Sequence, residues 1–333
     1  MNKKTTYKDA GVDIAKAENA LGSLKERIAA SHGKEVLKGV GLFGGFFDLS
    51  GHGLEAPVLV SSTDGVGTKL KVAILSHRHD TVGKDLVHHC INDIAVCGAK
   101  PLFFLDYFAS GALQPDVYTA VVGGLADACR DSGVALVGGE TAEMPDFYSP
   151  DEYDMCGTIV GIVEKDAIID GSKIAAGDRL IGVASNGLHT NGYTLARRVL
   201  LEDYMLDDQP EGLPHTLADE LLRIHTNYYP LISRVTVQAK VNGISHITGG
   251  GLEKNTMRLL APGLGLEIDH QAWEVPTIFE LIEKRGGVPV EDMRQTFNLG
   301  IGLVFVVPPA EAAQTLSLVK QQGFGAWDIG TVV

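Results

Sequence analysis

The segment DGVGTK (64–69) joins a carboxylate, two glycines, a hydroxyl and an ammonium directly after the strand-like residues 56–63. Carboxylate oxygens are preferred Mg²⁺ ligands, and glycine lets backbone N–H groups approach a phosphate closely. The pattern therefore predicts a magnesium–phosphate site, with Asp64 on the metal ion and Lys69 directed toward phosphate. An ordinary glycine turn after a strand is the alternative; a Walker A loop is excluded, because the order is TK and the G-x-x-x-x-G spacing is missing.

Three further acidic residues, Asp48, Asp93 and Glu140, each lie at the end of an apolar stretch. A carboxylate in such a place is costly unless it is paired or binds a cation. Together with Asp64 these residues predict an oxygen-ligand cluster for one or more Mg²⁺ ions that bridge ATP phosphates. Helix capping or solvent exposure accounts equally well for any single one of them.

Two glycine-containing loops in the second half carry many hydrogen-bond donors. The loop SNGLHTNG (185–192) separates a strand-like stretch from a helix, where polar or anionic substrate atoms often bind. Within it, His189 could act as a general acid or base near neutral pH, although a surface histidine in a turn is the simpler interpretation. The segment HITGGG (246–251) precedes a helix whose N–H groups could hold a phosphate, whereas a flexible turn would have the same sequence.

His88 and His89 stand next to Cys90, an arrangement that resembles a metal-binding cluster. Successive side chains on a helix point about 100° apart, so these three do not converge on one ion, and we predict no zinc site there. The four cysteines of the chain have no C-x-x-C spacing and lie in apolar stretches. They are expected to be buried free thiols, as in a reducing cytoplasm.

The composition excludes several classes of protein. The chain has 333 residues, 42 acidic against 28 basic side chains and a formal net charge of −14, which argues against a nucleic-acid-binding surface. The apolar run 299–309 is too short to cross a membrane, and the N-terminal sequence lacks the apolar core of a signal peptide. A hydrophobic content of 45% and 40 glycines instead indicate a well-packed protein whose backbone approaches a small-molecule ligand.

Helices and strands in mixed order must position these residues. Apolar residues from Ile14 to Ile28 recur at helical spacing, and residues 84–97 form a second amphipathic pattern that carries His89 and Asp93. Further helices are predicted at 116–130, 217–229, 252–260, 276–287 and 309–322, and strands at 102–108, 157–163, 179–185, 300–307 and 326–333. The polar, turn-rich segment 164–178 is the best domain boundary, so we expect an α+β protein of two domains.

Eight motifs coincide in order along the chain, and together they are far more specific than any one alone. They are YKDAGVDI (7–14), FGGFFDLS (43–50), STDGVGTKL (62–70), INDIAVCGAKPLFFLDYFA (91–109), GGETAEMP (138–145), SNGLHTNGY (185–193), HITGGGLEKN (246–255) and FNLGIGL (297–303). With these motifs the chain resembles the aminoimidazole ribonucleotide synthetases, also called phosphoribosylformylglycinamidine cyclo-ligases, over nearly its whole length.

The resemblance implies an ATP-dependent ligase of purine biosynthesis that closes formylglycinamidine ribonucleotide into 5-aminoimidazole ribonucleotide. ATP would phosphorylate the formamide oxygen, which makes it a leaving group, and the amidine nitrogen would then attack that carbon. ADP and phosphate are released. Such chemistry needs a cation-lined nucleotide site and a well-placed proton carrier.

The resemblance also implies roles for individual residues. Nucleotide binding is implied for Lys25, Asp64, Gly65, Gly67, Thr68, Lys69, Asn92 and Gly139, and magnesium binding for Asp64, Asp93 and Glu140. Catalysis is implied for His189, Lys69 and Asp93, and substrate binding for Ser185, Asn186, Gly187, Asn191, Thr248, Gly249 and Gly250. Either of the two loops in this last group would take the ribose 5′-phosphate. His88 and His89 depart from the family, whose members commonly have small or thioether side chains there.

The resemblance further implies a homodimer. An N-terminal ATP-binding domain (1–168) would form a β-barrel flanked by helices with its partner's copy, and a C-terminal α/β sandwich (169–333) would bind the substrate. Related enzymes fit less well: selenophosphate synthetase carries a reactive cysteine near its N-terminus, whereas residues 1–89 contain none. A non-catalytic nucleotide-binding protein would be expected to have lost charged loop residues such as Asp64 and Lys69, which are present.

Overall fold

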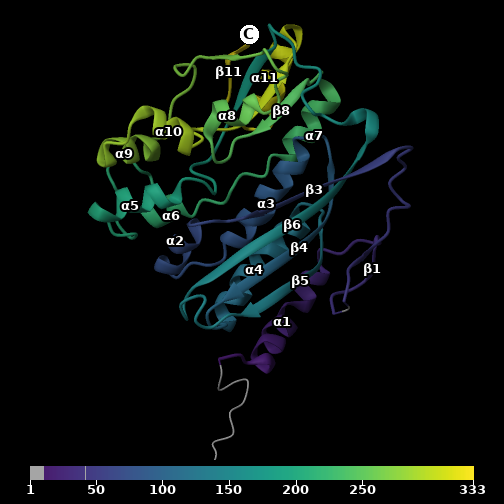
Figure 1. Ribbon diagram of the computed structural model, residues 1–333, viewed down its shortest axis with the longest axis vertical. Helices are drawn as coiled ribbons and strands as arrows, with labels where there is room; N and C mark the ends of the chain where they lie inside the picture. The colour runs from purple at the N-terminus through teal and green to yellow at the C-terminus, as the bar shows by residue number, and fades with distance from the viewer. Residues whose placement is uncertain (1–10, 42) are drawn as a thin grey trace, which may run out of the picture.

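The computed structural model describes residues 11–41 and 43–333, so the first four residues of the motif at 7–14 lie outside it. Two sheets form the frame, one from strands within residues 57–164 and one from strands within 179–332. Helix α3 (Val82–Ala95) lies between them (Figure 1). None of the described helices is both long and apolar enough to span a membrane.

The N-terminal sheet has four strands in the order β3-β6-β4-β5. They span Pro57–Gly65 (β3), Tyr153–Glu164 (β6), Lys100–Ser110 (β4) and Ala135–Glu143 (β5). β6 pairs antiparallel with β3 and β4, whereas β4 and β5 run parallel and are joined through helix α4 (Pro115–Asp131). Side chains alternate along the strands, so Phe104 and Ile159 are buried under α3 and α4 while Leu59 and Tyr107 are exposed on the other face.

Helix α1 (Ile14–Ala29) packs on α4 and β5 at the lower end of the view in Figure 1. Leu24 and Ile28 of its apolar stripe are buried, as the helical spacing predicts. Asp13 caps the helix by accepting a hydrogen bond from the backbone N–H of Lys16. The remaining elements of this half are β1 (Val36–Lys38) and β2 (Phe46–Phe47), which pair antiparallel, and helix α2 (Lys69–Ser76).

The C-terminal sheet has five antiparallel strands in the order β8-β10-β7-β11-β9. They span Gly243–His246 (β8), Ile301–Val307 (β10), Arg179–Ala184 (β7), Ala326–Val332 (β11) and Leu266–Ile268 (β9). Every residue of β10 is buried, because apolar clusters form on both faces of the sheet. The helices of this half are α5 (Tyr193–Asp203), α6 (Leu217–Leu221), α7 (Tyr229–Gln238), α8 (Gly251–Met257), α9 (Thr277–Gly286), α10 (Val290–Thr296) and α11 (Ala312–Gln321).

The prediction of one helix over 217–229 is wrong, because helix α6 ends at Leu221 and the chain has no helix again until α7 begins at Tyr229. Residues 222–228 are irregular and run along α3. Two buried side chains of α3 hold this segment, since Asp85 accepts the backbone N–H of His225 at 2.7 Å and Asn92 accepts a second N–H three residues later at 2.8 Å. Tertiary hydrogen bonds have therefore replaced the helical ones.

The α+β class is confirmed, with a mixed sheet in the first half and an antiparallel sheet with helices in the second. The barrel predicted between two copies of the chain stays a prediction. The N-terminal sheet of the described residues is open, with β3 and β5 as its edge strands.

Candidate active site

Helix α3 carries polar side chains on the face that it turns toward the C-terminal half of the chain. We call Asp64, His89, Asp93, His225 and His246 the junction cluster, because it lies where the two halves meet. Asp64 comes from the end of β3, the next two from α3, His225 from the irregular segment and His246 from the end of β8. Both halves therefore build one site.

Close contacts connect the members of the junction cluster. His89 Nε2 lies 2.9 Å from Asp64 Oδ2 and 3.9 Å from Asp93 Oδ2. On the other side, His246 Nδ1 lies 2.8 Å from Asp93 Oδ1, and His246 Nε2 lies 3.0 Å from His225 Nε2. A continuous chain of polar groups thus runs from the half-exposed Asp64 into the protein interior.

Burial and charge act in opposite directions on these groups. Burial alone would lower the pKa of His89, but the neighbouring carboxylates of Asp64 and Asp93 outweigh it and raise the pKa. Burial works against ionisation of both carboxyls, yet His89 and His246 hold their pKa values below the ordinary range. Burial lowers the pKa of His246, and it places that of His225 well below its usual value. The cluster therefore favours one charged imidazole between two carboxylates, beside two neutral rings.

The loop 185–191, between β7 and α5, is held by its own polar side chains. Ser185 Oγ donates to Asn298 Oδ1 at 2.8 Å, and Asn186 Nδ2 donates to the carbonyl of Ile224 at 2.7 Å. Gly187 has a φ of 136°, a conformation that L side chains rarely adopt, which explains a glycine at this position. These contacts fix the loop against the irregular segment that follows α6.

His189, in the same loop, is buried rather than exposed in a turn. Its ring stacks on that of His225 with the centroids 4.1 Å apart. Burial holds the pKa of His189 well below its usual value, so the ring is neutral near pH 7 and does not titrate there as the sequence suggested. His189 Nδ1 has no hydrogen-bond partner among the described residues. A substrate atom could satisfy this nitrogen.

The second predicted substrate loop lies beside the first. A Cβ added at Gly249 would stand 3.1 Å from Asn191 Oδ1, so the two loops are in contact. Gly250 has a φ of 105° and precedes α8, and the hydroxyl of Thr248 donates to Asn255 Oδ1 at 3.4 Å. The structure therefore brings together the residues for which we predicted substrate binding.

The prediction that Lys69 is directed toward phosphate does not agree with the position of its side chain. Its side chain is fully buried, and Nζ is paired with Asp85, 2.8 Å from Oδ2 and 2.9 Å from Oδ1. The same ammonium donates to the carbonyls of Arg223 at 2.6 Å and His189 at 3.2 Å. Burial lowers the pKa of Lys69, and Asp85 opposes that effect. Lys69 therefore connects the two halves in this structure and does not present its charge to a phosphate.

Asn92, expected to bind nucleotide, also has a different role here. Its Oδ1 accepts the backbone N–H of Tyr228, and its Nδ2 donates to the carbonyl of Thr226 at 2.8 Å. The side chain is fully buried, so both ends of the amide are used within the protein. Thr68, by contrast, is exposed at the start of α2, where its hydroxyl lies 2.9 Å from that of Thr194.

The four carboxylates predicted to bind magnesium do not all converge. Only Asp64 and Asp93 share a neighbour, since both carboxylates lie close to His89 Nε2, at 2.9 and 3.9 Å. Asp48 instead accepts the backbone N–H and the hydroxyl of Ser50. Glu140 lies on β5, three strands away from β3, which corresponds to roughly 14 Å across the sheet. A single ion within one chain therefore cannot use Glu140 together with Asp64.

A hollow beneath α1 forms the second polar region of this half. A cavity of about 240 Å³ lies between α1 and the strands β4 and β5, and two larger hollows of about 550 and 540 Å³ adjoin it. Most of the lining is apolar, as at Leu21 and Val40. Lys25 borders one of the adjoining hollows, and Gly139 and Glu140 border the central cavity and another hollow. We call this region the α1 cavity.

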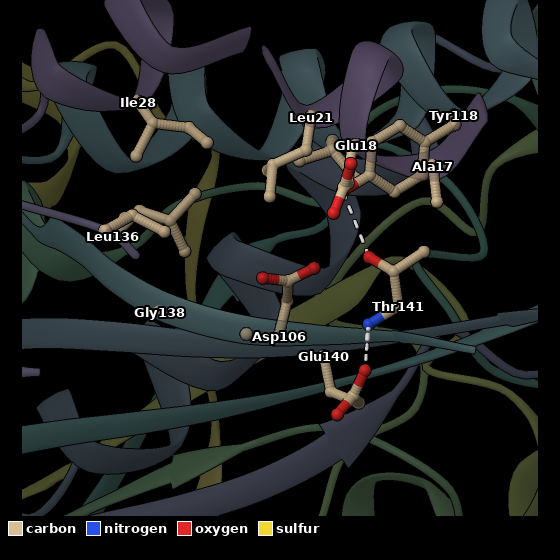
Figure 2. Close-up of a pocket in the computed structure, with 13 residues that line it drawn as sticks. Ala17, Glu18, Leu21, Ile28, Asp106, Tyr118, Leu136, Gly138, Glu140 and Thr141 are labelled. Carbon is tan, nitrogen blue, oxygen red and sulfur yellow. Dashed lines mark hydrogen bonds between the residues drawn. The ribbon is translucent and has the colours of Figure 1, made fainter. Parts of the chain in front are cut away.

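Asp106 is the one carboxylate of β4 that points into the α1 cavity (Figure 2). Burial raises the pKa of Asp106 to about 7. Glu140 points away on the other side of its strand, whereas Thr141 faces the cavity and its Oγ1 lies 3.1 Å from the hydroxyl of Tyr118. A Cβ at Gly139 would stand 2.1 Å from Asp106 Oδ1, so glycine there makes room for the acid.

Sequence reasoning missed Asp106, Asp85 and His225. A carboxylate inside the aromatic strand FFLDYFA was a signal for Asp106, since burial of an acid without a partner is costly. Asp85 stands in an apolar helix pattern in the same way as Asp93. No local signal marked His225, because its place in the cluster depends on the irregular path of residues 222–228.

Comparison with known proteins gives a consistent result. The model of the AIR synthase related protein N-terminal domain matches residues 54–163, and that of the C-terminal domain matches residues 175–333. The phosphoribosylformylglycinamidine cyclo-ligase of Geotalea daltonii is 49% identical over 99% of this chain and 95% of its own length. That of Anaeromyxobacter sp. (strain K) is 48% identical, with 98% and 95% coverage.

Among solved structures, the hydrogenase maturation protein HypE in complex with ATP is similar, with a TM-score of 0.67 and 17% identity. The match covers 95% of this chain and 86% of that one. At this identity the likeness concerns the fold alone. The relatives that are nearly half identical over almost the whole length, together with the two matching domain models, show that this chain belongs to the phosphoribosylformylglycinamidine cyclo-ligase family.

Proposed function

We propose that the protein uses ATP to cyclise formylglycinamidine ribonucleotide to 5-aminoimidazole ribonucleotide in purine biosynthesis. The observation that carries this proposal is the identity of 48–49% to named cyclo-ligases over at least 98% of the chain. ATP phosphorylates the formamide oxygen, the amidine nitrogen attacks the same carbon, and phosphate leaves as the imidazole ring closes. The arrangement of two loops around a buried histidine, next to paired carboxylates, is compatible with this chemistry.

In this proposal the nucleotide binds along the α1 cavity. Its apolar lining suits a purine base, and Lys25 supplies a positive charge at its border. Asp106 would accept a hydrogen bond from an amino or hydroxyl group of the nucleotide. Gly139 allows the backbone of β5 to come close to that ligand.

Asp64 and Asp93 would hold Mg²⁺, because both carboxylates lie beside His89 at the junction and hard oxygen donors suit this ion. When bound, Mg²⁺ would neutralise charge on the phosphate groups. Glu140 is excluded from that ion within one chain by its distance across the sheet, and Asp48 contacts Ser50 instead, so we no longer place them with Asp64.

The substrate would lie on the two adjoining loops, with Ser185, Asn186, Gly187 and Asn191 on one side and Thr248, Gly249 and Gly250 on the other. His189 Nε2 accepts the backbone N–H of Asn186 at 3.5 Å, so the neutral ring carries its proton on the unpartnered Nδ1 and would donate it to a substrate atom. Lys69 positions the backbone of His189 through the hydrogen bond from its ammonium, and it is a positioning residue rather than a phosphate ligand.

We also propose a homodimer formed through the open face of the N-terminal sheet. Leu59 is 56% exposed and Tyr107 37% exposed on that face, which favours its coverage by a second copy. Such pairing would form the predicted β-barrel between two chains. The domain division at 168/169 and a cytoplasmic location, with all four cysteines as free thiols, belong to the same proposal.

The direct test incubates the purified protein with Mg²⁺, ATP and formylglycinamidine ribonucleotide, and follows both the imidazole product and ADP. We expect equal amounts of the two products, and none when the ribonucleotide is omitted. ADP without the imidazole product, or no turnover that depends on the ribonucleotide, would contradict the proposal.

A further inference from the structure

We propose that His89, Asp93 and His246 bind a divalent first-row transition-metal ion, such as Zn²⁺ or Co²⁺, where the two halves of the chain meet. One ligand atom from each of the three residues can be chosen so that all lie within 4.8 Å of one another. Two imidazole nitrogens with a carboxylate oxygen form a donor set typical of zinc, and Mg²⁺ prefers oxygen donors alone. Cys90, which the sequence placed beside these histidines, is not part of the site.

The spacing of the donor atoms suits a small ion. In a tetrahedral zinc site with bonds of about 2.0–2.1 Å, neighbouring ligand atoms are about 3.3 Å apart. Here His246 Nδ1 lies 2.8 Å from Asp93 Oδ1, and His89 Nε2 lies 3.9 Å from Asp93 Oδ2. The two distances lie on either side of that value and end on the two oxygens of the Asp93 carboxylate.

His89 Nε2 is the atom that points most directly to an ion. The residue is only 3% exposed, and this nitrogen has no partner in hydrogen-bond geometry among the described residues. Asp64 Oδ2 lies 2.9 Å from this nitrogen, an ion-pair distance, but the pair does not have hydrogen-bond geometry. A buried ring nitrogen without a hydrogen bond is costly, and an ion between His89 and Asp93 would satisfy it.

The surrounding hydrogen bonds fit the ligand role of both histidines. A ligating histidine usually donates its other ring N–H to a neighbouring acceptor, which fixes the ring. His89 Nδ1 lies 2.7 Å from Thr190 Oγ1, and His246 Nε2 lies 3.0 Å from His225 Nε2. His225 Nδ1 lies 3.3 Å from the same Thr190 oxygen, which has two lone pairs for these donors. One set of ring tautomers therefore leaves both ligand nitrogens free for the metal.

This ion and the Mg²⁺ of the proposed reaction would share the carboxylate of Asp93, whose side chain is 25% exposed, whereas Asp64 at 45% exposed belongs to the Mg²⁺ site alone. The transition-metal ion would therefore bind when no Mg²⁺–nucleotide occupies the junction. The inference rests on the geometry of the junction cluster and does not require the proposed reaction to be correct.

The test uses the full-length protein, stripped of metal with a chelator that is then removed, without nucleotide or substrate. Co²⁺ is added stepwise, and its visible absorption is followed. We expect saturation at one ion per chain, displacement of Co²⁺ by Zn²⁺, and no displacement by an excess of Mg²⁺. Equal competition by Mg²⁺, or no saturable absorption change, would overturn the proposal and leave His89 as an imidazolium between two carboxylates.

Conservative variants identify the ligands. His89→Gln and His246→Asn keep a polar atom near each ligand nitrogen, and each should weaken Co²⁺ binding by about 10-fold or more. His270→Gln is the matched control, because His270 pairs with Glu253 in the C-terminal half outside the cluster. Unchanged affinity in both cluster variants, with normal circular dichroism, would overturn the assignment.

A second measurement uses the unmodified protein, so it remains informative even if the variants do not fold. Melting of the unmodified protein should shift to higher temperature with Zn²⁺ relative to chelator, since an ion that binds only the folded state stabilises it. No shift would contradict the proposal. Cyclisation with Mg²⁺ is assayed separately: turnover without Co²⁺ binding refutes only the metal site, and Co²⁺ binding without turnover refutes only the proposed reaction.

Discussion

The junction cluster and the α1 cavity both contain acidic side chains in partly or fully buried positions, yet their surroundings differ. At the junction each carboxylate has a partner, since Asp93 contacts His246 and Ser62, and Asp64 lies beside His89. In the α1 cavity Asp106 has no side-chain partner among the described residues, and burial raises its pKa to about 7. The side chains of the junction cluster therefore hold one another in place, whereas Asp106 faces the α1 cavity without a side-chain hydrogen-bond partner.

This difference indicates a division of labour. Side chains held by several partners keep their geometry without a ligand, which suits groups that act on a reacting bond. A buried acid that faces an apolar cavity gains its partner only when a ligand arrives. We therefore assign the chemistry to the junction and the binding of the nucleotide to the α1 cavity.

The largest effect on turnover is expected from substitution of Asp64 in the junction cluster, compared with substitution of Asp48, which the sequence grouped with it. Asp64→Ala should lower Mg²⁺-dependent turnover by about 100-fold or more, because it removes the exposed oxygen donor of the cluster. Asp48→Ala is the control, since Asp48 contacts Ser50 instead. Turnover assays at saturating substrate compare the two. Similar losses in both variants would show that the junction has no special role.

A second change tests how firmly the junction is organised. Asp85→Ala leaves the ammonium of Lys69 fully buried without its carboxylate, and should lower the free energy of unfolding by about 3–5 kcal/mol. Urea unfolding followed by circular dichroism measures the change. Glu280→Ala, which breaks the exposed helix pair with Lys284, should leave the unfolding midpoint unchanged. Equal midpoints for all three proteins would refute the buried pair as a stabilising contact.

A smaller effect, in the opposite direction, is expected in the α1 cavity. The pKa of Asp106 rises from 3.8 to about 7 on folding, so between these pH values the folded state holds a proton that the unfolded state has lost. Its contribution therefore reduces stability as pH rises through that window. Asp106→Asn removes this penalty, so its melting temperature should match the parent near pH 4 and exceed it above pH 7. A constant difference across that range would show that Asp106 does not titrate in it.

The sequence predicted several components of the junction cluster and its loops, although not their geometry. Helical spacing placed His89 and Asp93 on one helix, and glycine patterns marked the loops that contain Asn191 and Gly249. The elements that carry them agree closely with the predicted ranges, because long amphipathic patterns and buried apolar strands depend mainly on local periodicity.

The rest depended on contacts between distant segments. Lys69 was predicted to face phosphate from its place in a glycine loop, but its partner Asp85 stands on a different helix and draws it inward. The path of residues 222–228 is set by hydrogen bonds to α3, which no local pattern shows. Within one chain, Glu140 cannot join Asp64 on a single ion, because it lies on a different strand of the sheet, and Asp48 contacts Ser50 instead.

Steady-state kinetics with varied ATP distinguish binding at the α1 cavity from chemistry at the junction, by comparing Lys25→Met at the α1 cavity with His189→Ala between the substrate loops. We expect Lys25→Met to raise the KM for ATP roughly 10-fold with little change in kcat, because it removes a binding contact only. His189→Ala should instead lower kcat and leave the KM for ATP nearly unchanged. The reverse pattern, with kcat lost at Lys25 and only KM affected at His189, would contradict the assignment of binding to the cavity and chemistry to the junction.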